Sequence, residues 1–301
     1  MKYKTPNAFE MALVQHLQAR HRACGMAIDR LRQLIAFDRL VARLSAAGLE
    51  YLTKGGFVLE LRLERARTTR DVDISLYGDP ARLGERVAAA CALDLGDFFR
   101  FRLAPPTKAS LGVIGGPGVR YAGQRFVCTC SLGGKEFTRF GLDVAVADPP
   151  DCTPEYVDGL DWLAFAGVAM VRHPVLSREH HIAQKLHAYT LPRPDDRPNS
   201  RLKDLPDLVL LASAGPIRTR AVRAAIEATF SHRATHAPPS HLPPPPAHWA
   251  EGYPEMAADI GLTHATLDDV LVAARAFVDP ILASNDDAEW DPIGWVWRAV
   301  A

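Results

Sequence analysis

The chain has no long uninterrupted run of apolar residues. A helix that crosses a bilayer needs about 18 apolar residues in a row, whereas the apolar stretches of this 301-residue chain are short and bounded by charged groups. Residues 1–25 also lack the apolar segment of a secretory signal peptide, because polar and charged residues interrupt them throughout. We therefore expect a cytoplasmic protein without a membrane partner.

An excess of charge of one sign is also missing: 35 Lys and Arg residues balance 35 Asp and Glu residues. Proteins that bind long nucleic acids without sequence preference usually carry a basic excess. Any RNA contact must therefore rest on a local basic patch, which the predicted N-terminal helices offer, although a solvated helix face explains the same residues equally well. The arginines of this predicted patch are Arg20, Arg22, Arg30, Arg32, Arg39 and Arg43.

Several chemical signatures are absent as well. The five cysteines are odd in number and scattered, without zinc-binding spacing. Cys128 and Cys130 share one face of a predicted strand, which favours a buried, reduced pair. The chain has no P-loop, no nucleophile elbow and no Ser-His-Asp order, and its histidines lack a recognisable metal-ligand spacing.

The pattern of apolar residues predicts an α/β half followed by a helical half, with the boundary near residue 150. Residues 1–150 would form the core with its N-terminal helices, and residues 151–301 a helical domain that contains the proline-rich segment 237–248. Helices are expected at 6–22, 25–47, 57–64, 82–94, 177–189, 202–213 and 219–230, with two more in the last fifty residues. Strands of a mixed sheet are expected at 50–53, 71–76, 98–103, 125–130 and 137–146, with a hairpin turn at Gly133-Gly134.

Two carboxylates on one strand carry the main chemical signal. Asp71 and Asp73 are separated by one residue, so both project from the same face of the strand at 71–76. Two ionised carboxylates so close together repel each other, and Mg²⁺, which prefers oxygen ligands and phosphates, removes the conflict. The preceding Gly55-Gly56 turn allows backbone N–H groups to approach a triphosphate closely.

A third carboxylate, Asp143, faces away from the apolar side of the strand at 137–146. If that strand neighbours 71–76, Asp143 completes a cluster of three metal ligands that holds up to two metal ions, or it acts as the base. Later in the chain, Lys185 on a predicted helix is placed to neutralise the charge of the departing pyrophosphate. Asp204 and Asp207 lie on one helical face, where they orient Lys185 or contact the nucleotide.

These motifs, in this order, resemble the AbiEii/AbiGii family of nucleotidyltransferase toxins, which includes MenA-like toxins of type IV toxin–antitoxin systems. The resemblance rests on KGG at 54–56, RTTRDVD at 67–73, QKLHA at 184–188 and RLKDLPDL at 201–208. It implies a DNA polymerase β-like core with a helical C-terminal half, and the use of Mg²⁺ and a nucleoside triphosphate (NTP). It also implies a cognate antitoxin and, as in some relatives, transfer of nucleotides to the 3′ end of tRNA.

The resemblance extends to individual residues. Asp71 and Asp73 match the metal aspartates, Lys185 the motif lysine, and Asp204 or Asp207 the late acidic residue. Thr69 falls where some relatives carry a hydroxyl that is phosphorylated for neutralisation, so it is a candidate regulatory site. The residues expected to bind the nucleotide are Lys54, Gly55, Gly56, Thr69, Arg70 and Lys185.

The sequence thus predicts a Mg²⁺-dependent transferase that passes a nucleoside monophosphate (NMP) to an acceptor hydroxyl, and we expect that hydroxyl at a tRNA end. Two alternatives stay open at this point. One is a nucleotidyltransferase that acts on protein or on a small molecule, as antibiotic-modifying enzymes do. The other is a related module that has lost activity and binds a partner.

Overall fold

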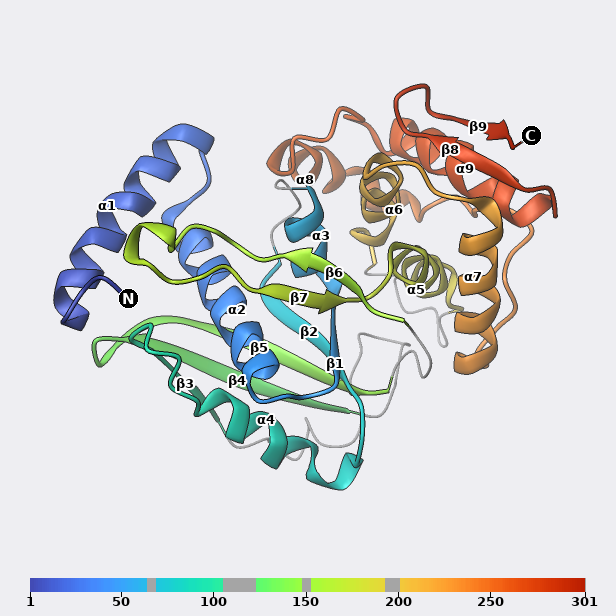
Figure 1. The fold of residues 1–301 in the computed structure, drawn as a ribbon. Coiled ribbons are helices and arrows are strands. Elements are labelled where there is room, and N and C mark those ends of the chain that lie inside the picture. Colours follow the sequence, from blue (N-terminus) through green and yellow to red (C-terminus); the bar gives the residue numbers. More distant parts are fainter. Residues whose placement is uncertain (64–68, 105–122, 148–152, 193–200, 301) are drawn as a thin grey trace.

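The computed structural model describes residues 1–63, 69–104, 123–147, 153–192 and 201–300. The N-terminal part of the chain is built around a mixed sheet, and the C-terminal part consists mostly of helices (Figure 1). The helices are α1 (Pro6–Cys24), α2 (Ile28–Ala46), α3 (Gly55–Leu63), α4 (Leu83–Cys91), α5 (Arg178–Thr190), α6 (Asp204–Ser213), α7 (Thr219–Arg233), α8 (Tyr253–Asp259) and α9 (Leu267–Ala283). Within these residues, no helix is both long and apolar enough to cross a membrane.

The sheet has seven strands in the order β3-β4-β5-β2-β1-β7-β6. They are β1 (Tyr51–Lys54), β2 (Asp71–Leu76), β3 (Phe99–Leu103), β4 (Gly123–Leu132), β5 (Lys135–Val146), β6 (Glu155–Asp158) and β7 (Arg172–Val175). β2 runs parallel to β5 and antiparallel to β1, while β4 and β5 form the hairpin predicted at Gly133-Gly134. The mixed α/β class is therefore confirmed, and β2 lies in the interior of the sheet.

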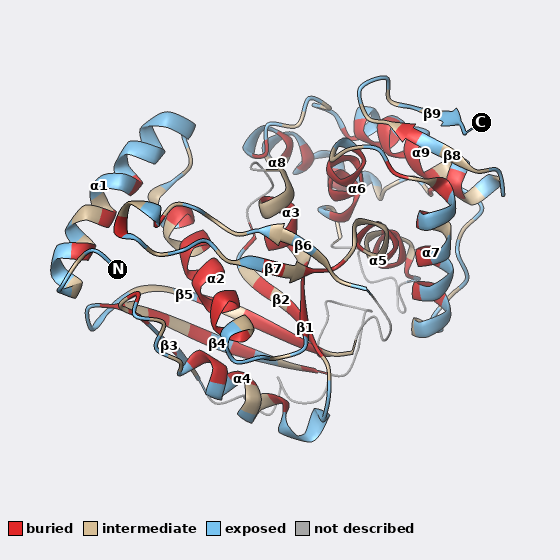
Figure 2. Ribbon diagram, viewed as in Figure 1, coloured by how far each residue is buried: buried red, intermediate tan, exposed pale blue. Residues whose placement is uncertain are grey.

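Alternation along β2 gives the sheet two different faces. Val72, Ile74 and Leu76 are buried in the first apolar core, which α2 covers (Figure 2). Phe37 of α2 packs edge-on against Phe140 of β5, with ring centroids 4.8 Å apart. The opposite, polar face of β2 is thereby left for Asp71 and Asp73, as the period of two requires.

A second apolar core lies among the C-terminal helices. α5, α6, α7 and α9 supply most of it, and Leu59 of α3 belongs to it as well. Trp290 lies in β8 (Ala288–Asp291), which pairs with β9 (Val296–Ala299). Its buried indole donates a hydrogen bond from Nε1 to the Ala212 carbonyl, at 2.9 Å. Because α3 begins at the end of β1 and packs into this second core, it ties the helical half to the sheet.

The prediction that the chain turns helical from about residue 155 is wrong for the next twenty residues. β6 and β7 extend the sheet, with Thr53 of β1 paired in parallel to Val175. Each strand has four residues, and β7 contains Pro174, so neither shows the alternation that identifies a strand. The division into two domains near 150 stays a prediction, while the sheet itself continues to Val175.

The predicted RNA surface on the N-terminal helices also needs correction. Arg30, Arg39 and Arg43 are buried, because α2 is surrounded by the core rather than lying on it. Arg43 donates to both carboxylate oxygens of Asp97, at 2.7 and 3.1 Å; Arg39 donates to the same group at 2.8 Å, and Arg30 pairs with Glu60. These three arginines neutralise internal carboxylates, as buried charges require, and are not available to RNA. Arg20, Arg22 and, in part, Arg32 remain accessible.

Candidate active site

Four charged residues form a row across the sheet at its polar face. Lys54 of β1 lies opposite Asp73 of β2, Asp73 lies opposite Asp143 of β5, and Asp143 lies opposite Arg125 of β4. Side chains opposite each other on one face of a sheet are close enough to interact. The condition set for Asp143, that its strand neighbours β2, is thus met, and the row places two cations outside two anions.

Glycines make room for the carboxylates. A Cβ on Gly55 would lie 2.1 Å from Oδ2 of Asp73, and Gly55 has a φ of +67° that favours glycine. On the other side, a Cβ on Gly141 of β5 would lie 2.2 Å from Oδ1 of Asp71. Both carboxylates therefore occupy space that any other residue at these two positions would fill, so the glycines fix where the carboxylates lie.

The surroundings of Asp73 favour a bound cation. Burial raises the pKa of Asp73 to about 6, and repulsion by Asp143 and Asp71 adds to this effect, whereas the charges of Lys54 and Lys185 lower it. Two lysines thus fail to offset the cost of ionising Asp73. A divalent cation between carboxylates supplies the missing positive charge.

Asp143 already has a partner in this structure. Arg125 donates to its two carboxylate oxygens, from Nε at 2.6 Å and from Nη2 at 2.5 Å. Over the described ranges, no three His, Cys, Asp or Glu side chains are arranged as metal ligands. The sheet places Asp73 opposite Asp143, with Asp71 two residues before Asp73 on β2, but Asp143 is engaged by an arginine that the sequence analysis did not single out.

Lys185 projects from α5 and is held by α6. Its ammonium lies 2.9 Å from Oδ1 of Asp204 and 2.7 Å from Oδ2 of Asp207, and both aspartates are buried. Of the two roles considered for these aspartates, the geometry supports orientation of Lys185. The charge of Lys185 acts on Asp73, so α5 carries it toward the carboxylates of the sheet.

Two side chains of α2 hydrogen-bond to the backbone of the segment that precedes β2. Arg30 donates to the carbonyl of Thr69 at 2.6 Å, and Gln33 donates to that of Arg70 at 3.3 Å. The Thr69 hydroxyl donates to the Asp71 carbonyl at 3.2 Å, and Thr69 is buried against Gly56. A modifying enzyme would reach this hydroxyl only after the segment moves, whereas the Arg70 side chain is exposed.

Sequence reasoning missed Arg125 and Gly141. Each is defined by its place opposite another strand, which no local pattern reveals, since β4 and β5 reach β2 from far along the chain. One signal was available for Arg125: if the hairpin is paired outward from Gly133-Gly134, the residue opposite Asp143 lies close to it. The β-bulge between Cys130 and Ser131 would still have shifted that count.

The fold and this arrangement of charges define the protein as a nucleotidyltransferase. The chain belongs to the family described as nucleotidyl transferase AbiEii toxin of type IV toxin–antitoxin systems, whose model matches residues 39–279. The resemblance noted from the sequence motifs is therefore confirmed. No curated protein is significantly similar to the chain.

One solved nucleotidyltransferase toxin agrees with this fold, and two further structures are more distantly similar. MenT4, a nucleotidyltransferase toxin from Mycobacterium tuberculosis, is similar with 18% identity and a TM-score of 0.53, covering 91% of this chain and 88% of its own. JHP933 from Helicobacter pylori is 14% identical, with a TM-score of 0.45, and covers 85% of this chain and 93% of its own. The antibiotic-resistance factor ANT(2″)-Ia is 19% identical, with a TM-score of 0.38, and covers 68% of this chain and 93% of its own.

Proposed function

We propose that the protein is a Mg²⁺-dependent toxin that transfers NMP from an NTP to the 3′ end of tRNA and thereby blocks translation. The observation that carries the proposal is the position of Asp71 and Asp73, each seated against a glycine that leaves space for its carboxylate. Membership of a nucleotidyltransferase toxin family supports the reaction class. It also supports an NTP as substrate and an antitoxin as partner.

Asp71 and Asp73 fit a magnesium site. Their donor atoms are carboxylate oxygens, and Asp73 carries a pKa of about 6 that a nearby cation would lower. Mg²⁺ is commonly held by one or two carboxylates together with phosphate and water. When bound, the metal supplies charge neutralisation for the triphosphate. Asp143 is the residue for a second metal or for accepting the proton of the acceptor hydroxyl, once Arg125 releases it.

Backbone and lysine groups complete the nucleotide site. Gly55 and Gly56 open α3, and N–H groups at the start of a helix bind anions. Lys54, which belongs to the charged row, comes directly before these glycines in the sequence. Lys185 is held in place by Asp204 and Asp207. In this arrangement Lys185 neutralises the pyrophosphate that leaves. Thr69 and Arg70 border the same turn, and the exposed guanidinium of Arg70 is suited to contact phosphate.

The proposal is tested by label transfer. Purified protein with Mg²⁺ is incubated separately with each of the four α-labelled NTPs, in the presence of total RNA and total protein. The Asp71→Ala/Asp73→Ala variant serves as the control. Label in a tRNA-sized band from wild type alone supports the proposal and identifies the preferred nucleotide.

Two other results would favour the alternatives. Label in the protein fraction would indicate a protein acceptor, and label in small molecules an antibiotic-modifying type of activity. If folded wild type labels nothing and also fails to bind NTP with Mg²⁺, the proposed activity is overturned in favour of a partner-binding module.

A further inference from the structure

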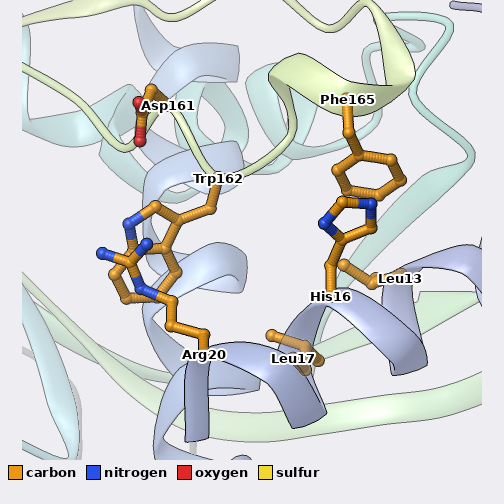
Figure 3. A pocket seen from close by; sticks show the side chains of 7 residues that line it. All are labelled: Leu13, His16, Leu17, Arg20, Asp161, Trp162 and Phe165. Atoms are coloured by element: carbon orange, nitrogen blue, oxygen red, sulfur yellow. The ribbon is translucent and has the colours of Figure 1, made fainter. Parts of the chain in front are cut away.

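A pocket lies away from the charged row, between α1 and the segment that follows β6. It encloses about 230 Å³. α1 contributes His16 and Arg20, and the later segment contributes Asp161, Trp162 and Phe165 (Figure 3). α1 precedes residue 39, where the match to the family model begins, so one wall of the pocket lies outside the matched residues, while Asp161, Trp162 and Phe165 lie within them.

Two planar stacks form the walls of the pocket. The guanidinium carbon of Arg20 lies 3.9 Å from the ring centroid of Trp162. The His16 ring stacks on Phe165 with centroids 3.8 Å apart and planes at 17°. The two stacks stand side by side, with Leu13 and Leu17 of α1 next to them (Figure 3). Unpaired bases stack on such rings and on arginine planes.

The helix that carries these groups is locally basic. Residues 1–24 contain Lys2, Lys4, Arg20 and Arg22 but Glu10 as their sole acidic residue, in a chain whose formal net charge is zero. Arg20 and Arg22 are exposed, unlike the buried arginines of α2. A phosphate backbone is attracted to such a patch, and a base attached to that backbone meets the two stacks.

Hydrogen bonding in the pocket distinguishes among bases. Asp161 lines the pocket and is exposed, and its carboxylate accepts hydrogen bonds without donating any. Adenine, cytosine and guanine offer an exocyclic amino group with two N–H donors, whereas uracil offers only its ring N3–H, so the amino-bearing bases suit this carboxylate better. The geometry also holds without a ligand, because the backbone N–H of Lys2 donates to the Ala166 carbonyl at 2.7 Å and fastens the start of the chain beside α1 to the opposite wall.

We propose that this pocket binds an unpaired, amino-bearing base of the acceptor RNA, a role that rests on the proposed function. Arg20 and His16 present the stacking planes, and Asp161 accepts from the amino group. RNA is favoured over a protein partner because a guanidinium and an imidazole ring, each stacked on an aromatic ring of a locally basic face, match bases joined by phosphates. The pocket then holds the acceptor while its 3′ end is modified elsewhere.

Direct binding tests this site without the reaction. The Asp71→Asn/Asp73→Asn protein is titrated with fluorescent single-stranded oligo(A), oligo(C) and oligo(U), and binding is followed by anisotropy. In this background, Arg20→Ala and Trp162→Ala are expected to weaken oligo(A) binding roughly tenfold, since one base stack is worth about 1–3 kcal/mol. Arg22→Ala removes the same charge next to the pocket and is the matched control; it should have a smaller effect. Oligo(U) should bind more weakly than oligo(A) and oligo(C).

The result that overturns the proposal is equal weakening by Arg20→Ala and Arg22→Ala with no effect of Trp162→Ala, which would indicate attraction by charge alone. Absence of oligonucleotide binding by the parent protein overturns it too and leaves the face to a protein partner. Trp162→Phe keeps a ring and should retain most of the affinity, which separates stacking from loss of folding. If binding follows the pocket but wild type transfers no label to RNA, the proposed function fails while the RNA site stands.

Discussion

Asp143 accepts two hydrogen bonds from Arg125, at 2.6 and 2.5 Å, while its backbone lies in register with Asp73. Arg125 therefore competes with any metal ion for the third carboxylate. We expect Arg125→Met to bind Mg²⁺ more tightly than wild type, because both oxygens of Asp143 become available. Without metal, the variant should be less stable by about 1–2 kcal/mol. The loss is this small because half of the Arg125 side chain is exposed, and solvent weakens the ion pair.

Thermal unfolding with and without Mg²⁺ measures both effects. Arg100→Met is the matched control: Arg100 pairs with Asp94 through two hydrogen bonds, at 2.8 and 2.6 Å, on another strand of the sheet. Its side chain is 55% exposed, the same fraction as that of Arg125. A Mg²⁺-induced rise in Tm for Arg125→Met no larger than that of wild type would contradict the competition.

The close approach of Gly55 to Asp73 predicts that Gly55→Ala displaces the carboxylate. Gly25→Ala is the control, because Gly25 has a similar φ of +74° but open space where its Cβ would lie, against +67° and a clash at Gly55. Each variant should lose about 1 kcal/mol of stability through backbone strain. Gly55→Ala alone should lose nucleotidyl transfer, by roughly a hundredfold, since small displacements of reacting groups have effects of that size. Equal activity of the two variants would exclude a positional role for Gly55.

The triad of Lys185, Asp204 and Asp207 allows structure and catalysis to be separated. Lys185→Met should unfold more readily, by a few kcal/mol at about the scale of a broken buried ion pair, because it removes the ammonium that pairs with two buried carboxylates. Replacing all three residues, as Lys185→Met/Asp204→Asn/Asp207→Asn, removes the uncompensated charges and should restore much of that stability. Transfer activity should stay low in both, because the ammonium is absent. Recovery of activity together with Tm would show that Lys185 serves the fold alone.

The raised pKa of Asp73 predicts a pH dependence with a defined sign. Folded Asp73 holds its proton to about pH 6, against 3.8 as the ordinary value. The folded state thus binds more protons than the unfolded state between these values, so the contribution of Asp73 to stability is present below about pH 4 and is lost as pH rises through 6. Chemical denaturation of the metal-free protein across this range should show the decline, and Asp73→Asn should reduce it.

Metal binding should show the opposite trend. Mg²⁺ requires ionised Asp73, so its affinity rises with pH up to about 6 and then levels off with respect to this group. Titration calorimetry at several pH values measures this trend. An affinity that stays constant between pH 5 and 7 would contradict the assigned environment of Asp73.

The elements that are defined by neighbouring residues, such as β2 and the helix that carries Lys185, could be predicted from the sequence. β2 begins and ends where alternation placed it, at Asp71 and Leu76, because one face is apolar and the other polar. The helix that carries Lys185 and the one that carries Asp207 also follow from apolar spacing. The glycine turn before Asp73 was readable because its residues lie close in the sequence, and the ordered motifs identified the family.

Features that depend on long-range pairing could not be predicted in this way. The arginines of α2 appear as a solvated face in sequence, yet Asp97, far along the chain, draws Arg43 to a fully buried position. β6 and β7 are recognised only through their neighbours in the sheet, because four residues carry too little pattern. Arg125 reaches Asp143 through a hairpin whose register includes a β-bulge.

The charged row has a consequence for the synthesis of the protein. Asp73 meets Asp143 only when β5 has emerged and paired with β2, and Lys185 has its partners only after α6 has been made. Chains are synthesised from the N-terminus, and domains fold as units during this process. On the proposed function, an unfinished chain that ends before Asp207 lacks part of the site, so transfer activity would arise only after about two thirds of the polypeptide has been translated.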